Sequence, residues 1–228
     1  MIPMQKSNRK ANIVIIAVSV LVFLFFLYFG FNALWVKLNK SDVHYSKKLP
    51  IFYERELDAN GDTLYHTVDD FKLLNQYGDS VTLDTYKDKI LLVSFFFASC
   101  ETVCPKMNGY IGTHIYREFE KDTNIRFLSF TVDPSNDSPA VLLKYAQSFN
   151  AKSNWQFLTG SKAQIYDLAA NSFKIPGAED VHNGLFHSNK IVLVDKQKRV
   201  RGVFDTDGQN EKSATIEDVR ALKLEYIK

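Results

Sequence analysis

The sequence predicts an α/β domain behind an N-terminal transmembrane helix, with a mostly parallel sheet that is covered by helices on both faces and ends in an antiparallel hairpin. Strand-like and helix-like segments alternate from about residue 90 to residue 173, which is typical of parallel strands with covering helices. Residues 90–97 are apolar almost throughout, as a strand buried on both faces should be. Residues 13–31 carry no charge and form a segment long enough to cross a bilayer.

The apolar segment divides the chain and indicates its orientation. Lys6, Arg9 and Lys10 precede it, and basic residues mark the cytoplasmic side of a membrane. A cleaved secretory signal peptide is the alternative, but its apolar region usually spans about 7–15 residues and ends at a small-residue cleavage site, which residues 30–35 match poorly. We therefore expect a cytoplasmic N-terminus at residues 1–11, a transmembrane anchor at 12–36, a stalk at 37–50 and one folded domain at 51–228.

Charge and compartment narrow the function classes. Three of the 28 Lys and Arg residues precede the anchor, which leaves 25 against 26 Asp and Glu residues, so the outer domain is near neutral and no nucleic acid is expected as a partner. The segment before the anchor is too short for an organelle transit peptide, which favours a bacterial inner membrane with the domain in the periplasm. Thiols in that compartment are not kept reduced by glutathione.

Turn and capping signals place the elements of the domain. The signals are Asn60-Gly61 (type I′) and Gly78 for two hairpins, Pro105 and Ser138-Pro139 for two helix starts, and the capping boxes Ser161-x-x-Gln164 and Thr215-x-x-Asp218 for two more. The expected strands are residues 51–57, 63–68, 71–74, 80–83, 90–97, 125–132, 155–158, 190–195 and 200–204, and the expected helices are one opened by Pro105, residues 139–149, residues 161–173 and a terminal helix from residue 215.

The only two cysteines, Cys100 and Cys104, directly follow the buried strand 90–97. Reactive groups gather beyond the carboxyl ends of the strands in such sheets. Two cysteines four residues apart can form a disulfide, hold a soft metal, or do both. In a regular helix their Cα atoms would be about 6.2 Å apart, near the upper limit for a disulfide. A purely structural disulfide is the competing interpretation, but so small a loop would stabilise the domain little.

Three blocks of the sequence, taken in order, resemble one family. They are residues 95–105 (FFFASCETVCP), residues 131–138 (TVDPSNDS) and Phe186-His187-Ser188 followed by IVLVD at residues 191–195. Over about residues 71–207 the chain is similar to the Sco/SenC proteins, which are membrane-anchored, thioredoxin-fold copper chaperones for assembly of the binuclear copper centre of cytochrome c oxidase. The resemblance implies a thioredoxin-like fold and copper ligation by Cys100, Cys104 and His187.

The implied ligand set suits copper on bonding grounds as well. Two thiolates and a neutral imidazole hold Cu(I) in a low-coordinate site and can retain Cu(II), whereas a structural zinc site needs four protein ligands. His182, in the same loop as His187, is the rival imidazole. His114 is expected to pack on the apolar stripe of its helix. Asp133 is expected to start a turn.

The position of the thiols indicates their acidity. The N-terminus of the helix should stabilise a thiolate at Cys100, while the carboxylate of Glu101 should oppose it. Thiolate character should therefore be moderate. A strongly oxidising disulfide needs a much more stable reduced form, so we expect the pair to act as a reductant or a metal site and not as a general oxidant.

These observations predict a membrane-anchored copper chaperone that delivers copper to the copper subunit of cytochrome c oxidase or keeps the cysteines of that subunit reduced. The expected partners are that subunit, other copper chaperones or thiol reductants, and the membrane. The main alternative is a periplasmic thiol-disulfide oxidoreductase, with Cys100 and Cys104 as its redox-active pair and no metal transfer. A peroxidase of the peroxiredoxin type is a weaker one, because Cys100 lacks the Pro-x-x-x-Thr-x-x-Cys context.

Overall fold

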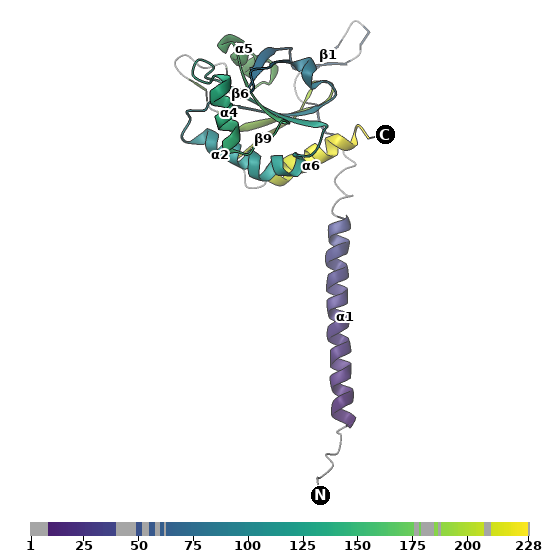
Figure 1. The fold of residues 1–228 in the computed structure, drawn as a ribbon. Coiled ribbons are helices and arrows are strands. Elements are labelled where there is room, and N and C mark those ends of the chain that lie inside the picture. The colour runs from purple at the N-terminus through teal and green to yellow at the C-terminus, as the bar shows by residue number, and fades with distance from the viewer. Residues whose placement is uncertain are drawn as a thin grey trace. The chain divides into compact units, whose positions relative to one another are not determined.

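The computed structural model describes residues 9–39, 49–51, 55–57, 60–61, 63–175, 178, 185–186, 188–207 and 211–227. The chain forms two compact units, Met1–Lys47 and Lys48–Lys228. The first unit contains helix α1 (Arg9–Asn39), and the second contains the other helices and all the strands of the described residues (Figure 1).

Helix α1 extends three residues beyond each end of the predicted anchor at residues 12–36. Its segment Ile15–Asn32 has a mean hydropathy of 2.4, and none of that segment is buried within the protein. Among the described residues this is the one helix that is long and apolar enough to cross a membrane. An apolar surface on all sides of a helix is typical of a membrane span, whereas a helix on a soluble domain buries one stripe. The orientation of the anchor stays a prediction.

A mixed sheet of seven strands forms the centre of the second unit, with the order β4-β3-β7-β6-β5-β8-β9. The three middle strands β5, β6 and β7 run parallel, and antiparallel pairs extend the sheet on both sides. The predicted α/β class with its terminal hairpin is confirmed, and parallel pairing is confined to the middle strands. The strands are β3 (Lys72–Asn75), β4 (Ser80–Thr82), β5 (Ile90–Phe96), β6 (Ile125–Thr131), β7 (Trp155–Thr159), β8 (Lys190–Val194) and β9 (Val200–Asp205).

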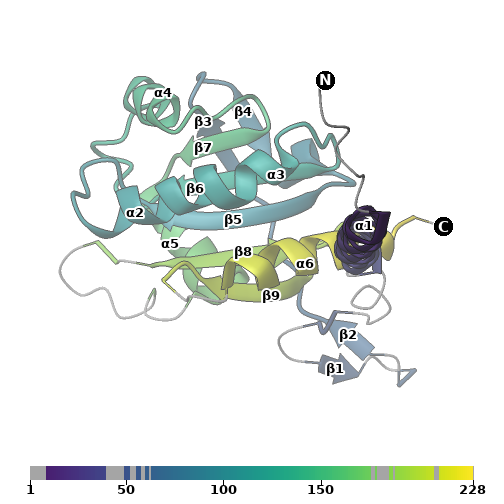
Figure 2. The ribbon, with the colours of Figure 1, turned by 90° about the horizontal axis from the view of Figure 1, so that it is seen from below.

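Helices cover both faces of this sheet, as expected from β5, whose seven residues are all buried and, apart from Ser94, all apolar. One face carries a continuous helical run that contains the second cysteine, together with α4 and α6, and the other face carries α5 and η3 (Figure 2). The elements are α2 (Val103–Tyr110), the π-helical η2 (Ile111–Tyr116), α3 (Arg117–Phe119), α4 (Pro139–Ser148), α5 (Lys162–Asp167), the π-helical η3 (Leu168–Ser172) and α6 (Glu211–Leu224).

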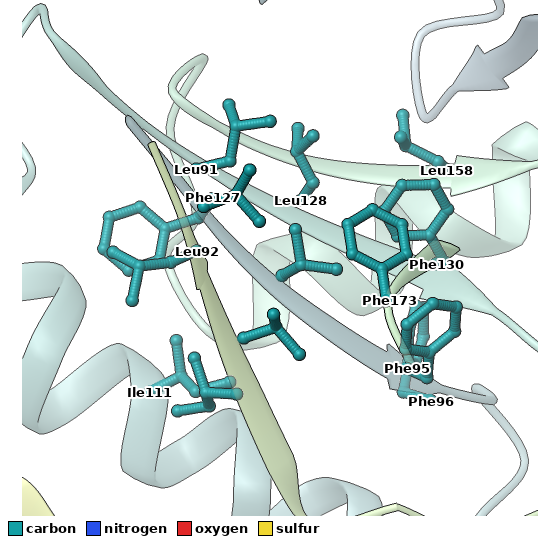
Figure 3. Close-up of a cluster of buried hydrophobic side chains, with 14 of the residues drawn as sticks. Leu91, Leu92, Phe95, Phe96, Ile111, Phe127, Leu128, Phe130, Leu158 and Phe173 are labelled. Atoms are coloured by element: carbon teal, nitrogen blue, oxygen red, sulfur yellow. The ribbon is translucent and has the colours of Figure 1, made fainter. Parts of the chain in front are cut away.

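Aromatic rings fill the core around the carboxyl end of β5 (Figure 3). Phe95 stacks on Phe130 of β6 at 5.3 Å between ring centroids and contacts Phe173 at 5.7 Å. Phe96 points to the other face, where its ring stacks on Tyr145 of α4 at 4.9 Å. The loop that follows Phe96 therefore starts from a rigid strand end.

Of the three predicted capping positions Ser138, Ser161 and Thr215, the first two are N-cap residues in the structure and the third is not. Helix α6 begins at Glu211, so the predicted cap at Thr215 is wrong, and Thr215 is a buried residue inside the helix. Ser138 and Ser161 do occupy the N-cap positions of α4 and α5, but neither side chain makes a capping hydrogen bond.

The first predicted hairpin is confirmed. β1 (Arg55–Leu57) and β2 (Thr63–Tyr65) pair antiparallel, and Leu57 is the partner of Thr63, so the strands lie on either side of Asn60-Gly61 as the sequence predicts. Gly61 has a φ of 82°, in the left-handed region that favours glycine. The second hairpin, β3 and β4, is confirmed, with Gly78 at a φ of 85°.

A buried arginine ties the start of the second unit to its end. Arg201 of β9, 2% exposed, donates to the carbonyl oxygens of Leu49 and Pro50 at 2.8 and 3.1 Å. The same guanidinium contacts the carboxylates of Asp195 at 3.1 Å and Glu225 at 2.8 Å. Asp195 directly follows β8 and lies near the amino end of β5, because Leu91 pairs with Val194. This is the opposite end of β5 from the one that leads to the cysteines.

Candidate metal centre

The two thiols lie where β5 leads into α2. Cys100 sits in the connecting loop, and its N–H donates to the carbonyl oxygen of Phe97 at 3.2 Å. Helix α2 begins at Val103, so the prediction that Pro105 opens it is wrong by two residues, and Cys104 lies in its first turn. Both cysteines are reduced and buried, with Cys100 6% and Cys104 1% exposed. The predicted pair is thus a preformed dithiol at the carboxyl edge of the sheet.

The sulfur of Cys100 accepts hydrogen bonds from the first turn of the helix. The N–H of Cys104 donates to it at 3.4 Å, and the hydroxyl oxygen of Thr102 is 4.0 Å away. Burial by itself would raise the pKa of Cys100, but the N–H groups of Cys104, Thr102 and Val103 outweigh it and hold the pKa below its usual value. The predicted thiolate character at Cys100 therefore has a local cause.

Cys104 has the opposite acidity. Burial raises its pKa to about 12, against a hydrogen bond from the backbone of Phe97 that lowers it. The charge of Cys100 and that of Asp137 raise it further. Of the two thiols, Cys100 therefore ionises more readily, because its pKa is lowered, and Cys104 keeps its proton at neutral pH.

A buried carboxylate supports the loop that carries Cys100. Asp137, 1% exposed, accepts a hydrogen bond from the N–H of Ala98 at 3.0 Å and another from the hydroxyl of Thr131. Burial raises the pKa of Asp137, and the charge of Asp133 contributes to the rise. Asp133 starts the predicted turn, since its carbonyl oxygen accepts from the N–H groups of Asn136 and Asp137. Sequence reasoning missed Asp137, although its position four residues after Asp133 and just beyond a buried strand was a usable signal.

Both candidate imidazole ligands, His187 and His182, lie outside the described residues. The neighbours of His187 are described. The ring of Phe186 lies 5.8 Å from that of Phe95, and Ser188 precedes β8, whose Ile191 pairs with Ser94. The chain on either side of His187 therefore runs close to the carboxyl end of β5.

The histidines that the structure describes are not beside the thiols. His114 is exposed and packs edge-on against Tyr110 at 5.2 Å, so the prediction that it packs on the apolar stripe is wrong. The π-helical geometry of η2 accounts for this, because it shifts the helical register from residue 111 onward. His66 interacts through Nε2 with the carbonyl oxygen of Ser172 at 2.8 Å. No cluster of three His, Cys, Asp or Glu side chains with metal-binding geometry occurs within the described part of the chain.

A reduced dithiol at the end of the first long strand of a mixed α/β sheet defines a thioredoxin-like protein with a soft-metal or redox site. The sequence pattern of SCO1/SenC matches residues 60–223, and the chain therefore belongs to the SCO1/SenC family.

Individual relatives agree with this assignment. The chain is 36% identical to the SCO1 protein homolog of Bacillus subtilis over 135 residues, which cover 55% of this chain and 69% of that protein. It is similar to the structure of BsSco, a member of the Sco family of cytochrome c oxidase assembly proteins with a disulfide switch, at a TM-score of 0.59 and 30% identity over 70% of this chain and 94% of the other. Copper-bound ScoI of Bradyrhizobium japonicum is similar at a TM-score of 0.56 and 25% identity, over 68% of this chain and 99% of ScoI.

Proposed function

We propose that this chain is a membrane-anchored copper chaperone that holds copper through Cys100, Cys104 and His187 and assists assembly of the binuclear copper centre of cytochrome c oxidase. The observation that carries the proposal is the reduced, buried dithiol at the start of α2 in a chain of the SCO1/SenC family. The copper in ScoI and the place of BsSco among oxidase assembly proteins support it.

The donor chemistry fits a soft metal. The sulfur of Cys100 already receives N–H bonds that stabilise a thiolate. Cys104, with a pKa of about 12, gives up its proton when a cation takes the place of that proton, as thiol ligands do. Burial of both sulfurs keeps water away from them. Copper, when bound, supplies a thiophilic ion that the ligands of a partner can take over.

The choice of His187 as the third ligand has positional support. Its neighbours Phe186 and Ser188 flank the end of β5, and the thiols follow the same strand end. A residue deeper in the loop, such as His182, would lose more conformational freedom on binding. His187 is therefore the imidazole ligand that we propose.

The proposed setting is a bacterial inner membrane, with α1 as the anchor and the domain in the periplasm. The apolar span Ile15–Asn32 of α1, and the basic residues Lys6, Arg9 and Lys10 that precede this span, support this placement. The proposed partner is the copper subunit of the oxidase, and other copper chaperones or thiol reductants would supply copper or electrons.

Metal analysis tests the proposal. The full-length chain in detergent, loaded anaerobically with Cu(I), should retain one copper per chain, and Cys100→Ser should retain none. Ser99→Ala, which alters the exposed neighbour of Cys100, is the matched control and should retain copper like the unaltered chain. Full copper content in Cys100→Ser would contradict the proposal.

A second function, reduction of disulfides in target proteins, is favoured by the opposite acidities of the two thiols. The thiolate of Cys100 would attack a disulfide sulfur of the target and release the first target thiolate. Cys104 would then lose its proton and attack Cys100, so that the second target thiol leaves and a Cys100–Cys104 disulfide forms. Two results together would favour a general oxidoreductase over a copper chaperone as the function of this chain. They are rapid oxidation of a reduced, unfolded substrate by the oxidised chain, and no protection of the thiols from alkylation by copper.

A further inference from the structure

Phe186, the residue before the proposed imidazole ligand, is held by two aromatic contacts. It is 7% exposed. Its ring lies 5.4 Å from the ring of Tyr166 on α5, with the two rings edge-on at 89°, and 5.8 Å from the ring of Phe95 on β5. Aromatic pairs at such separations attract each other beyond the burial of their surface. The ring of Phe186 is therefore fixed to a helix and to the sheet at the same time.

The two contacts of Phe186 differ in their surroundings. Phe95 belongs to the core, where it stacks on Phe130. Tyr166 is half-buried, and the ammonium of Lys162, one turn earlier on α5, lies 5.1 Å from its ring centroid. A change at Phe95 would disturb the core, whereas a change at Tyr166 can loosen Phe186 without opening the core.

The hydroxyl of Tyr166 makes a second connection to the same residue. Burial and the charge of Asp133 raise the pKa of Tyr166, and a hydrogen bond from the backbone N–H of Phe186 lowers it. Tyr166 thus holds Phe186 by its ring and by its backbone. The ring contact alone would let the chain turn about the ring, and the backbone bond restricts that rotation.

The chain is held again just after residue 187. Ser188 is 7% exposed, and its Oγ accepts a hydrogen bond from the N–H of Lys190, the first residue of β8, at 3.2 Å. His187 lies outside the described residues, but it is one peptide unit from Phe186 and one from Ser188. Contacts on both sides therefore limit where a residue at position 187 can go.

We propose that Tyr166 is a positioning residue, which fixes Phe186 against β5 and so keeps the neighbouring His187 within reach of the thiols. The inference rests on the proposed function, in which His187 is a copper ligand. A ligand in a loop loses backbone freedom when it binds, and this loss weakens binding. Where the neighbouring residue is already held, part of the loss precedes the arrival of the metal, so copper is retained more firmly.

Copper retention by the full-length chain in detergent tests the inference. Tyr166→Leu removes both connections to Phe186, and the loaded variant should release copper to a chelator about tenfold faster, as for loss of an aromatic contact and a hydrogen bond. Its Cu(II)-thiolate absorption should shift toward that of His187→Ala. Lys162→Met is the matched control, because it removes the cation near the same ring and keeps the contact with Phe186. It should retain copper like the unaltered chain.

Two further variants separate positioning from a general loosening of the fold. If Tyr166 acts through His187, Tyr166→Leu should have no additional effect on copper release in a chain that already carries His187→Ala. Tyr166→Phe keeps the ring and loses the acceptor for the N–H of Phe186, so it should show part of the effect. The same tenfold acceleration with and without His187 would overturn the inference.

A metal-free measurement tests the position of residue 187 directly. In a chain with His187→Cys and Cys104→Ser, position 187 can form a disulfide with Cys100. Equilibration with glutathione then gives the effective concentration of one thiol at the other. Tyr166→Leu should lower this effective concentration about tenfold, and Lys162→Met should leave it unchanged.

An effective concentration that Tyr166→Leu does not lower would overturn the inference, and so would equal losses in Tyr166→Leu and Lys162→Met. If Tyr166→Leu does not fold, Tyr166→Phe is judged by the same measurements, with a smaller expected loss. Failure of His187→Ala to weaken copper retention would instead overturn the proposed ligand set. The effective concentration, measured without metal, would still decide the role of Tyr166.

Discussion

The backbone N–H of Cys104 donates to the sulfur of Cys100 at 3.4 Å, so one cysteine supplies a hydrogen bond that stabilises the thiolate of the other. The same first helical turn that supplies this donor buries Cys104 more deeply than Cys100. The pKa of Cys100 is therefore lowered, while that of Cys104 rises to about 12.

Alkylation should distinguish the two cysteines. At pH 7 iodoacetamide should modify Cys100 first, because only a thiolate reacts, and Cys104 should react appreciably only as the pH approaches its pKa of about 12. Peptide mass analysis after short exposure measures the order. The Cys100→Ser chain should stay almost unmodified at pH 7. Equal labelling of both cysteines at pH 7 would be incompatible with the described geometry.

Replacement of histidines should separate the two candidate ligands. His187→Ala should weaken copper retention and change the Cu(II)-thiolate absorption, because it removes the imidazole, while His182→Ala should do neither. Copper content after dialysis against a chelator and the visible spectrum measure both effects. The opposite pattern would transfer the role to His182.

The buried carboxylate of Asp137 should make stability depend on pH. Its folded-state pKa is raised, so the folded chain binds more protons than the unfolded chain between the two pKa values, and stability falls as the pH rises through that interval. In Asp137→Asn this fall should disappear, since the amide oxygen still accepts from Ala98 and no charge is buried. Urea unfolding at a series of pH values from about 3 upward measures it.

At a constant pH, Asp137→Ala should lower the unfolding free energy more than Asp137→Asn does. It leaves the N–H of Ala98 and the hydroxyl of Thr131 without their acceptor, which should cost about 1–3 kcal/mol of unfolding free energy. Asp137→Asn is the control. A loss in Asp137→Asn as large as that in Asp137→Ala would mean that the charge itself holds the loop.

Removal of the buried arginine should destabilise the domain strongly. Arg201→Met leaves buried Asp195 with less compensation and takes the donors from Leu49 and Pro50, so the unfolding free energy should fall by about 3 kcal/mol. Arg220→Met, which breaks an exposed pair with Glu118, should cost less than about 1 kcal/mol. Urea titration of both variants measures the difference, and equal losses would contradict it.

The sequence was sufficient for the sheet because its signals are local and strong. Residues 90–97 form an apolar run, which fits only a strand that is buried on both faces. The cysteine pair directly follows this run, so the position of the strand also gave the position of the thiols. Helix starts were less predictable. Thr215 satisfies a capping pattern, yet α6 begins four residues before it, at Glu211.

The side chains around the thiols could not be found in the same way. Asn108 and Tyr145 meet only because α2 and α4 lie on one face of the sheet, and this juxtaposition depends on strand order. Likewise, Asp137 acts on Ala98 across 39 positions of sequence. Periodicity reports which face of an element is apolar, but it does not report which elements share a face.

Because Arg201 bonds to Leu49 and Pro50 and so fixes the start of the domain, the segment before Lys48 can be replaced by another sequence. The guanidinium holds the first residues of the domain at one end of the strands, and the cysteines follow the other end. A different leader, a longer spacer or an affinity tag joined before Lys48 would thus end at a fixed attachment point one strand length away from the sulfurs. Engineering of the tether and engineering of the thiols can therefore proceed as separate tasks in this protein.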